Sequence, residues 1–161
     1  MRPLHRAVRV LWQHPWPNWG LLLYAGGLTI GVRAALWASS LSRVTRGLRR
    51  VATTLPQRSP ATPRYRRRAA WAAHAVGRRL LPDRPCLTQA LVLQYLLLRR
   101  GDEEAELHIG VTKGEDSSLQ AHAWVERDGY VLVGVTDAPE TYERFEDLNT
   151  KMEATGPIES S

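Results

Sequence analysis

The sequence predicts an α+β fold in which a helical N-terminal region precedes a small antiparallel sheet. Three observations support this fold class. Residues 85–101 have the composition and the end signals of one buried helix. Residues 106–111 alternate like a strand, and residues 120–133 form two β-patterned runs around Asp128-Gly129, which is a strong hairpin signal. At 161 residues the chain is long enough for one domain with a helical appendage.

The predicted helix at 85–101 has a recognisable beginning and end. Pro85 suits a helix start, where its missing N–H costs nothing. Arg99 and Arg100 lie in the last turn, where the helix dipole favours cations, and Gly101 supplies a left-handed cap. The helix has a broad apolar surface, so we expect most of it to be buried. The single cysteine of the chain, Cys86, therefore lies in the first turn, where the dipole and the backbone N–H groups favour a thiolate.

A candidate base lies 36 positions after the cysteine. His122 is within the first strand of the predicted hairpin, in the run AHAWVE at 121–126. A cysteine that begins a buried helix, with a histidine on a downstream strand, is the arrangement of papain-like and transglutaminase-like enzymes. The alternative is a buried structural cysteine and an unrelated strand histidine. Spacing alone does not decide between these two interpretations.

A series of short motifs occurs in one order along the chain: RPCL at 84–87, QAL at 89–91, LRRG at 98–101, LHIGV at 107–111, AHAWVE at 121–126 and DG at 128–129. This series resembles the transglutaminase-like leader peptidases of lasso peptide biosynthesis, in the split form where a separate protein recognises the leader. The close match covers about residues 66–134. The resemblance implies a transglutaminase-like (papain-like) cysteine peptidase core with Cys86 and His122 as catalytic residues.

The resemblance also implies partners for the chain. The substrate would be a lasso precursor peptide, whose leader is removed with the help of the separate leader-recognition protein. A separate lasso cyclase would then join the freed amine to an acidic side chain. Transglutaminase-like relatives can also perform acyl transfer. Hydrolysis is therefore what the resemblance implies, and the residues alone do not distinguish it from acyl transfer.

The third catalytic residue is where the sequence departs from the family. Family members often carry an aspartate twelve residues after the histidine, and this position is Gly134 here. With a three-residue hairpin loop His122 would face Gly134, whereas with a two-residue turn it would face Val135, with Asp137 diagonally beside it. Asp137 is therefore the candidate that orients His122. The alternatives are a Cys–His dyad, or another orienting group such as a loop side chain or a backbone carbonyl.

Composition and charge exclude several classes of protein. No tetrad of Cys and His predicts a metal site, and no glycine-rich phosphate loop or dinucleotide motif predicts a cofactor. Residues 1–80 contain 15 arginines and no lysine or acidic residue, whereas residues 81–161 contain 7 basic and 16 acidic residues. Such asymmetry favours an acidic partner or surface for the basic half. We expect no nucleic-acid binding, because the aromatic residues lie in apolar stretches and not among the arginines.

The chain divides into three predicted parts: a basic, hydrophobic helical region at 1–65, the peptidase core at 66–150 and a polar tail at 151–161. The apolar part of the helix expected after Asn18 is shorter than the ~20 residues that a bilayer requires, so we expect it to be buried or to lie at a membrane surface through residues 19–50. The lone cysteine fits a cytoplasmic protein. The apolar and basic residues 19–50 would associate this protein with a membrane. Of the other histidines, His108 lies on a strand that should neighbour His122.

Three functions follow from these patterns. The first is a cysteine peptidase of lasso peptide maturation, with Cys86 as nucleophile and His122 as base. The second is a non-catalytic transglutaminase-like binding or scaffold protein of the same biosynthetic complex, which the missing aspartate makes plausible. The third is a basic adaptor at a membrane surface. The retention of both Cys86 and His122 favours the enzyme.

Overall fold

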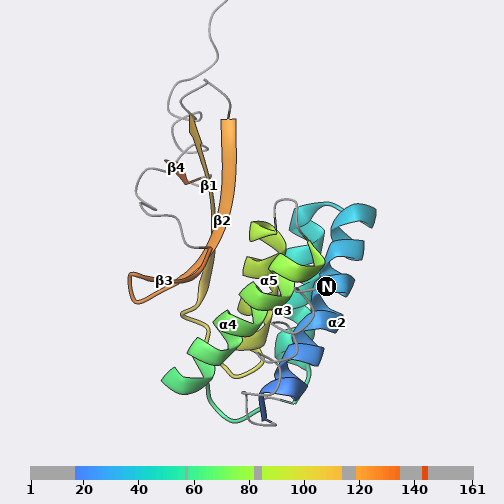
Figure 1. The fold of residues 1–161 in the computed structure, drawn as a ribbon, viewed down its shortest axis with the longest axis vertical. Helices are drawn as coiled ribbons and strands as arrows, with labels where there is room; N and C mark the ends of the chain where they lie inside the picture. Colours follow the sequence, from blue (N-terminus) through green and yellow to red (C-terminus); the bar gives the residue numbers. More distant parts are fainter. Residues whose placement is uncertain (1–16, 57, 82–84, 114–118, 135–142, 145–161) are drawn as a thin grey trace, which may run out of the picture.

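The structure is a computed structural model that describes residues 17–56, 58–81, 85–113, 119–134 and 143–144. These residues form four helices followed by four strands: α2 (Pro17–Ala38), α3 (Leu41–Thr54), α4 (Pro63–Leu80), α5 (Cys86–Leu98), β1 (Glu106–Lys113), β2 (Leu119–Arg127), β3 (Tyr130–Val133) and β4 (Glu143–Arg144). The strands form one antiparallel sheet in the order β3-β2-β1-β4, which stands beside the helices (Figure 1). The predicted α+β class is therefore confirmed.

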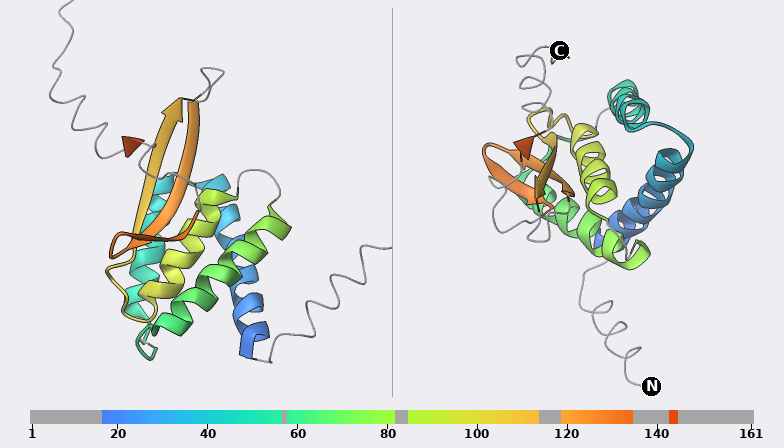
Figure 2. Two further views of the ribbon diagram at one scale, coloured as in Figure 1. Left: turned by 60° about the vertical axis from the view of Figure 1, so that its left-hand side comes forward. Right: turned by 90° about the horizontal axis from the view of Figure 1, so that it is seen from above.

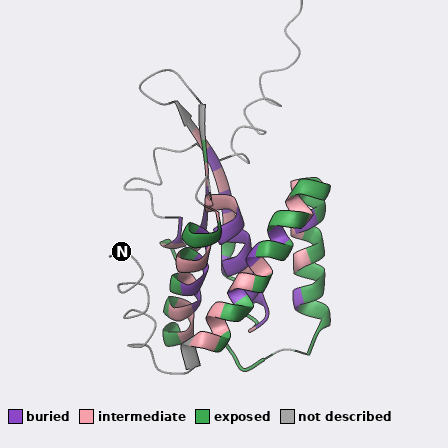
Figure 3. Cartoon of the chain, turned by 45° about the vertical axis from the view of Figure 1, so that its right-hand side comes forward, coloured by how far each residue is buried: buried purple, intermediate pink, exposed green. Residues whose placement is uncertain are grey.

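Helix α5 lies at the centre of the fold. It packs against the three other helices and against β1, β2 and β3. Figure 2 shows it, seen from above, between the sheet on one side and α2 and α3 on the other. Ten of its 13 residues are buried, as the sequence predicts, and Figure 3 shows this buried layer between more exposed helices. Helix α5 therefore contributes to the apolar core from every side.

The predicted proline and glycine signals at the ends of α5 are found in the structure, whereas the helix ends at Leu98, so that Arg99 and Arg100 follow its last turn and do not lie in it. Pro85 is the N-cap residue. At the other end Gly101 has a φ of 68°, its N–H donates to the Leu98 carbonyl at 3.0 Å, and the Asp102 N–H donates to the Leu97 carbonyl at 3.1 Å. This is the Schellman pattern that a left-handed glycine cap produces.

Arg99 joins the end of α5 to the end of α3. The residue is only 8% exposed. Its Nη1 donates to the carbonyl oxygens of Ala52, Leu55 and Pro56 at 3.3, 3.1 and 3.0 Å. The last carbonyls of a helix have no donor within the helix, so the guanidinium of Arg99 satisfies groups of α3 that would otherwise be buried unpaired.

Helix α4 begins at Pro63 and so includes the arginine-rich run 64–68. The Thr62 hydroxyl accepts a hydrogen bond from the Tyr65 N–H at 3.2 Å, and Pro63 occupies the first turn. These are ordinary helix-start signals.

Helices α4 and α5 cross closely at Gly77. A Cβ atom built there would lie 2.3 Å from Cγ of Gln89. Gln89 is 4% exposed and its Nε2 donates to the His74 carbonyl at 3.3 Å. Glycine at this position therefore permits the two helices to approach with the Gln89 side chain between them.

Helix α2 is buried on one face. Ala25, Thr29 and Val32 follow the spacing of a single helix face and are buried, and α2 packs on α4 and α5. The helix continues past Arg33 to Ala38, so its apolar part, Trp19–Ala38, is 20 residues long, which is longer than expected. Length and composition would allow this helix to cross a membrane, but core helices and signal sequences pass the same test.

The other face of α2 carries an exposed apolar stripe. The α2 stripe consists of Leu23, Ile30 and Trp37, which are seven residues apart and are 74%, 63% and 91% exposed. A spacing of seven places side chains on one face of a helix. Exposed apolar surface of this kind is unusual in a monomeric protein and commonly marks an interaction site.

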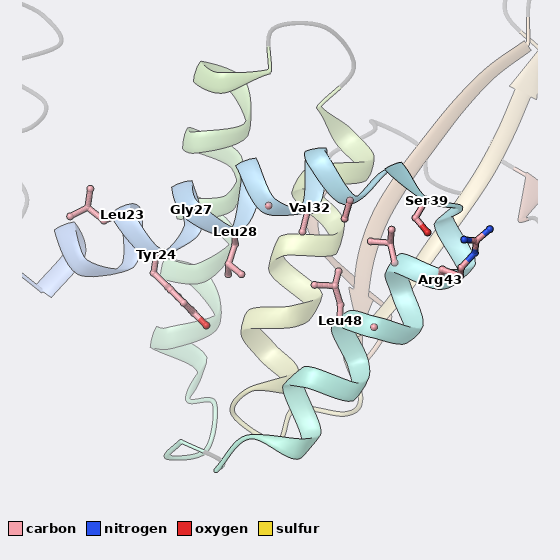
Figure 4. Close-up of a pocket in the computed structure, with 12 residues that line it drawn as sticks. Leu23, Tyr24, Gly27, Leu28, Val32, Ser39, Arg43 and Leu48 are labelled. Carbon is pink, nitrogen blue, oxygen red and sulfur yellow. The ribbon is translucent and has the colours of Figure 1, made fainter. Parts of the chain in front are cut away.

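A groove of about 610 Å³ runs between α2 and α3 beside this stripe (Figure 4). Its walls are mostly apolar and include Leu28, Val32 and Leu48, whereas Ser39 and Arg43 lie at one end. Helix α3 buries Val44 and Ala52. It exposes the four arginines that the sequence places on a helix face: Arg43, Arg46, Arg49 and Arg50.

Asp102 connects the helices to the sheet. Its side chain is 2% exposed. It accepts from Nε of Arg66 on α4 at 2.6 Å and from Nε of Arg127 at the end of β2 at 2.7 Å. Arg127 also pairs with Glu104 and Asp128. A buried carboxylate with two guanidinium partners is strongly held, so this contact fixes the lower end of β2 on the helical layer.

Candidate active site

Cys86 is the first residue of α5 and is half-buried. The backbone N–H groups of a first helical turn have no acceptor within the helix, and the helix dipole is positive at this end. Both features are suited to stabilising negative charge on the sulfur, or on an oxygen bound beside it. The buried side chains that follow in α5 hold this turn in place.

His122 lies on β2, opposite Gly110 of β1. Its neighbours Ala123 and Val125 belong to the core shared with the helices. Alternation along the strand therefore puts His122 on the other face of the sheet, together with Trp124. The two rings are stacked, with centroids 6.5 Å apart and an angle of 19° between their planes. Trp124 is 1% exposed and so provides a fixed surface for the imidazole.

A backbone carbonyl holds the ring of His122. Its Nε2 lies 3.0 Å from the carbonyl oxygen of Gly134. A carbonyl can only accept, so this hydrogen bond requires the proton on Nε2 in the neutral imidazole. Nδ1 is then the basic nitrogen, the one that can take a proton from a nucleophile. The Gly134 carbonyl thus has the orienting role that a carboxylate has in a Ser-His-Asp triad.

The hairpin register differs from both expected alternatives. Asp128 and Gly129 form the predicted two-residue turn, with φ of 52° and 77°, and Arg127 pairs with Tyr130. A bulge between Val125 and Glu126 then shifts the pairing by one residue, so that Val125 pairs with Val133. A shift of one residue changes which side chains share a face. The pairing from which Asp137 was chosen is therefore not the one observed. Asp137 itself lies outside the described residues, and its role stays a prediction.

Gly134, whose carbonyl holds His122, is a position that the sequence analysis treated only as a missing carboxylate. Its φ is 86°, and a Cβ atom built there would lie 2.5 Å from the Ala123 carbonyl oxygen and 2.9 Å from Cα of Trp124. An aspartate would be strained at this position in both respects. A glycine directly after a strand, where a close backbone approach is required, is the available signal in the sequence.

Cys86 and His122 lie on elements that pack directly against one another, α5 and β2. His122 contacts Gly134 and Trp124, and the register places its side chain on the sheet face opposite Ala123 and Val125. The structure therefore brings α5 and β2 together but places the imidazole on the face away from the core that the two elements share, so a proton transfer between Cys86 and His122 requires their side chains to approach one another at the start of α5.

His108 shares the face of His122, but Trp124 separates the two. The rings of His108 and Trp124 are 5.8 Å apart, and His108 pairs with Trp124 across the strands. His108 Nε2 lies 3.7 Å from a carboxylate oxygen of Glu106 and 3.9 Å from one of Glu126. His108 thus lies near the site as expected, but its contacts are those of a histidine packed on Trp124 beside two carboxylates.

Among the residues that the structure describes, no group of three or more His, Cys, Asp or Glu side chains could hold a metal ion. The described groups at the site are a half-buried thiol, an oriented imidazole and a helix start. These groups are suited to nucleophilic attack on a carbonyl and proton transfer to a leaving group. An α+β fold with a cysteine that begins a buried helix and a histidine on a downstream strand is the arrangement of the papain-like and transglutaminase-like class.

Comparison with known families agrees with this class. The family model described as the transglutaminase-like superfamily matches residues 28–150. The match covers more than half of the chain, so this protein belongs to the transglutaminase-like superfamily, which includes cysteine peptidases. No curated protein and no solved structure matched the chain.

Proposed function

We propose that this protein is a cysteine peptidase that removes the leader from a lasso precursor peptide. The observation that carries the proposal is the hydrogen bond from His122 to the Gly134 carbonyl, because it leaves Nδ1 as the basic nitrogen of a ring that packs on buried Trp124. Membership of the superfamily supports thiol chemistry. The order of the motifs around Cys86 and His122 supports the leader-peptidase activity within it.

The chemistry of the reaction needs few groups. His122 Nδ1 accepts the proton of the Cys86 thiol, and the sulfur attacks the scissile carbonyl carbon. The Cys86 backbone N–H stabilises the resulting oxyanion. Collapse of this intermediate breaks the peptide bond, and the imidazolium gives its proton to the leaving amine. A water molecule, deprotonated by His122, then attacks the thioester and releases the leader carboxylate and the free thiol.

The Gly134 carbonyl affects the rate of this reaction. A carboxylate orients the imidazole and also stabilises the imidazolium by its charge, whereas a carbonyl orients the ring through a neutral dipole. The peptidase therefore relies on geometry more than on charge stabilisation at this position. We expect a slower enzyme than a relative with a carboxylate at the equivalent place.

A separate protein is proposed to bind the leader. Within residues 17–80 the described segments are helical, so they offer no β-rich module for leader recognition. The arginines of α3 form an exposed basic surface on which an acidic partner, such as the leader-recognition protein or the lasso cyclase, can dock. Leader binding by the isolated chain as tight as that by the pair would contradict this division of labour.

We propose in addition that the α2 stripe lies at an anionic membrane surface. The stripe presents three large apolar side chains, and the exposed arginines on α2 and α3 supply the charge that anionic lipid head groups attract. This contact would make a cytoplasmic peptidase membrane-associated without a membrane-spanning segment.

The second candidate function is a non-catalytic scaffold in the same complex. The partner of His122 Nε2 is the uncharged Gly134 carbonyl, where a catalytic triad would have a carboxylate. This difference favours the scaffold, because a scaffold needs no negative charge beside the imidazole. A scaffold would still bind its partners but would release no leader.

The test is incubation of the purified chain with the precursor peptide encoded beside it, with and without the leader-recognition protein, followed by mass spectrometry. We expect leader release by the wild type and none by Cys86→Ala or His122→Ala. Gln94→Ala, a half-buried change on α5 outside the site, is the matched control and should retain release. Release by Cys86→Ala would refute the peptidase, and precursor binding without release by the wild type would establish the scaffold.

A further inference from the structure

A second pocket, of about 480 Å³, lies at the opposite end of the helical layer from the start of α5. The beginnings of α2 and α4 and the end of α5 meet there, at the lower end of the molecule in Figure 1. We call it the arginine pocket. Its walls comprise Gly20, Leu21, Tyr24, Arg58, Tyr65, Arg68 and Arg100.

Three guanidinium groups line this pocket without a carboxylate to balance them. Arg58, Arg68 and Arg100 come from three separate segments of the chain, and none of the lining residues is acidic. The acidic residue nearest in sequence to Arg100 is Asp102, and its two oxygens are already bonded to Arg66 and Arg127. Like charges that gather without a counter-charge repel one another, and a bound anion relieves this repulsion.

Aromatic rings hold two of the guanidiniums in place. Arg58 lies over the ring of Tyr24, 5.7 Å from its centroid, and Arg100 lies over the ring of Tyr65 at 3.8 Å. Stacking of this kind fixes the plane of the guanidinium and does not consume its N–H donors. The donors at the edges are therefore oriented but not used by the rings.

The donors of Arg100 are incompletely satisfied. Its Nη1 donates to the Ser59 carbonyl at 3.1 Å, whereas its Nε is buried and has no hydrogen-bond partner. Nε of Arg99, which does not line the pocket, is unpaired in the same way, so the three uncompensated guanidinium charges are the stronger sign of an anion site. The missing acceptor and the missing negative charge are both supplied by an oxyanion.

We propose that the arginine pocket binds the carboxylate of an acidic peptide segment. A carboxylate matches the planar fork of a guanidinium, and the tyrosine rings and Leu21 offer apolar walls for the rest of a side chain. The volume is within the range of about 300–1,000 Å³ that ligand sites occupy. At a rise of about 1.5 Å per residue along α5, the pocket is about 20 Å from Cys86. It is therefore a separate binding site, and the proposal does not depend on the peptidase activity.

The test measures binding of a fluorescent pentaglutamate peptide to the full chain in the Cys86→Ala background, with pentaglutamine as the matched peptide. The double variant Arg58→Gln/Arg68→Gln removes two charges from side chains for which no hydrogen bond is found within the described part of the chain. The double variant Arg78→Gln/Arg79→Gln removes two exposed charges from the last turn of α4, outside the pocket, and serves as the matched control. Circular dichroism verifies that both variants are folded.

We expect the Kd for pentaglutamate to rise about tenfold or more in the pocket variant and less than about twofold in the control. Equal weakening in both variants would show attraction by net charge alone and would overturn the proposal. Binding of pentaglutamine as tight as that of pentaglutamate would overturn it as well. Sodium phosphate that displaces pentaglutamate at an equal concentration of anionic groups would overturn the peptide part, because it would assign the pocket to small free anions.

Discussion

Replacement of Gly134 by alanine separates the two reasons for which the structure requires glycine there. The first is the φ of 86°, which costs a residue with a Cβ about 1–2 kcal/mol. The second is the approach of the Ala123 carbonyl, 2.5 Å from the position of the new Cβ. Backbone atoms cannot move aside as a flexible side chain can, and overpacking of this kind costs about 1–3 kcal/mol. We therefore expect Gly134→Ala to lower the free energy of unfolding by about 2–5 kcal/mol.

Gly129→Ala is the matched control for this prediction. Gly129 has a φ of 77°, but a Cβ there meets nothing within 4 Å, so the variant should lose only the conformational part, about 1–2 kcal/mol. Urea denaturation followed by circular dichroism measures both variants. A Gly134→Ala variant no less stable than Gly129→Ala would refute the close approach, and therefore the backbone position that holds His122.

The same variant tests the tautomer of His122. In the wild type the nitrogen chemical shifts of the imidazole should report a proton on Nε2, because Nε2 donates to Gly134. Gly134→Ala should weaken this preference. A wild-type imidazole protonated on Nδ1 would contradict the assigned base.

Three further predictions concern the helical layer. Gly77→Ala should destabilise the protein by about 1–3 kcal/mol, because its Cβ would meet Gln89, and addition of Gln89→Ala should recover part of the loss in a double-mutant cycle of urea titrations. Burial, followed by the hydrogen bond between the hydroxyls of Tyr24 and Tyr95, raises the pKa of Tyr95 to about 12. The unfolded chain then loses this proton first, so stability should fall between about pH 10 and 12, and less steeply in Tyr95→Phe. For the α2 stripe, Trp37→Gln should lower cosedimentation with phosphatidylglycerol vesicles about tenfold, and the exposed control Tyr130→Gln should not; equal sedimentation of both would contradict the membrane contact.

Local patterns were sufficient to predict the elements that carry their own signals. The helix around Cys86 has a proline at its start, an apolar body and a glycine cap, and all three features are found in the structure. The turn at Asp128-Gly129 was equally clear, because left-handed φ values at two successive positions favour that dipeptide. Each of these features depends on residues that are adjacent in the sequence.

Features that depend on contacts between distant residues were not predictable. No local pattern marks the bulge that shifts Val125 onto Val133. A glycine after a strand permits a close backbone approach at position 134, but it does not say that the partner is the Ala123 carbonyl. Arg99 was expected to be favourable to the helix dipole, whereas in the structure it is buried and bonded to α3.

The contacts of Arg99 have a consequence for anyone who divides this chain into fragments. A fragment that begins after Pro56 would lose the three carbonyl oxygens that the Arg99 guanidinium binds, and the apolar side of α5 that packs on α2 and α3 would face water. Such a fragment should aggregate when it is expressed alone. When α2 and α3 are added as a second polypeptide, Arg99 can bind its carbonyl oxygens again and the apolar side of α5 can be covered again. Both contacts favour reassembly of the two polypeptides. The protein is therefore a candidate for complementation from two fragments. One fragment would carry Cys86 and α5, and the other would carry α2 and α3, which cover α5.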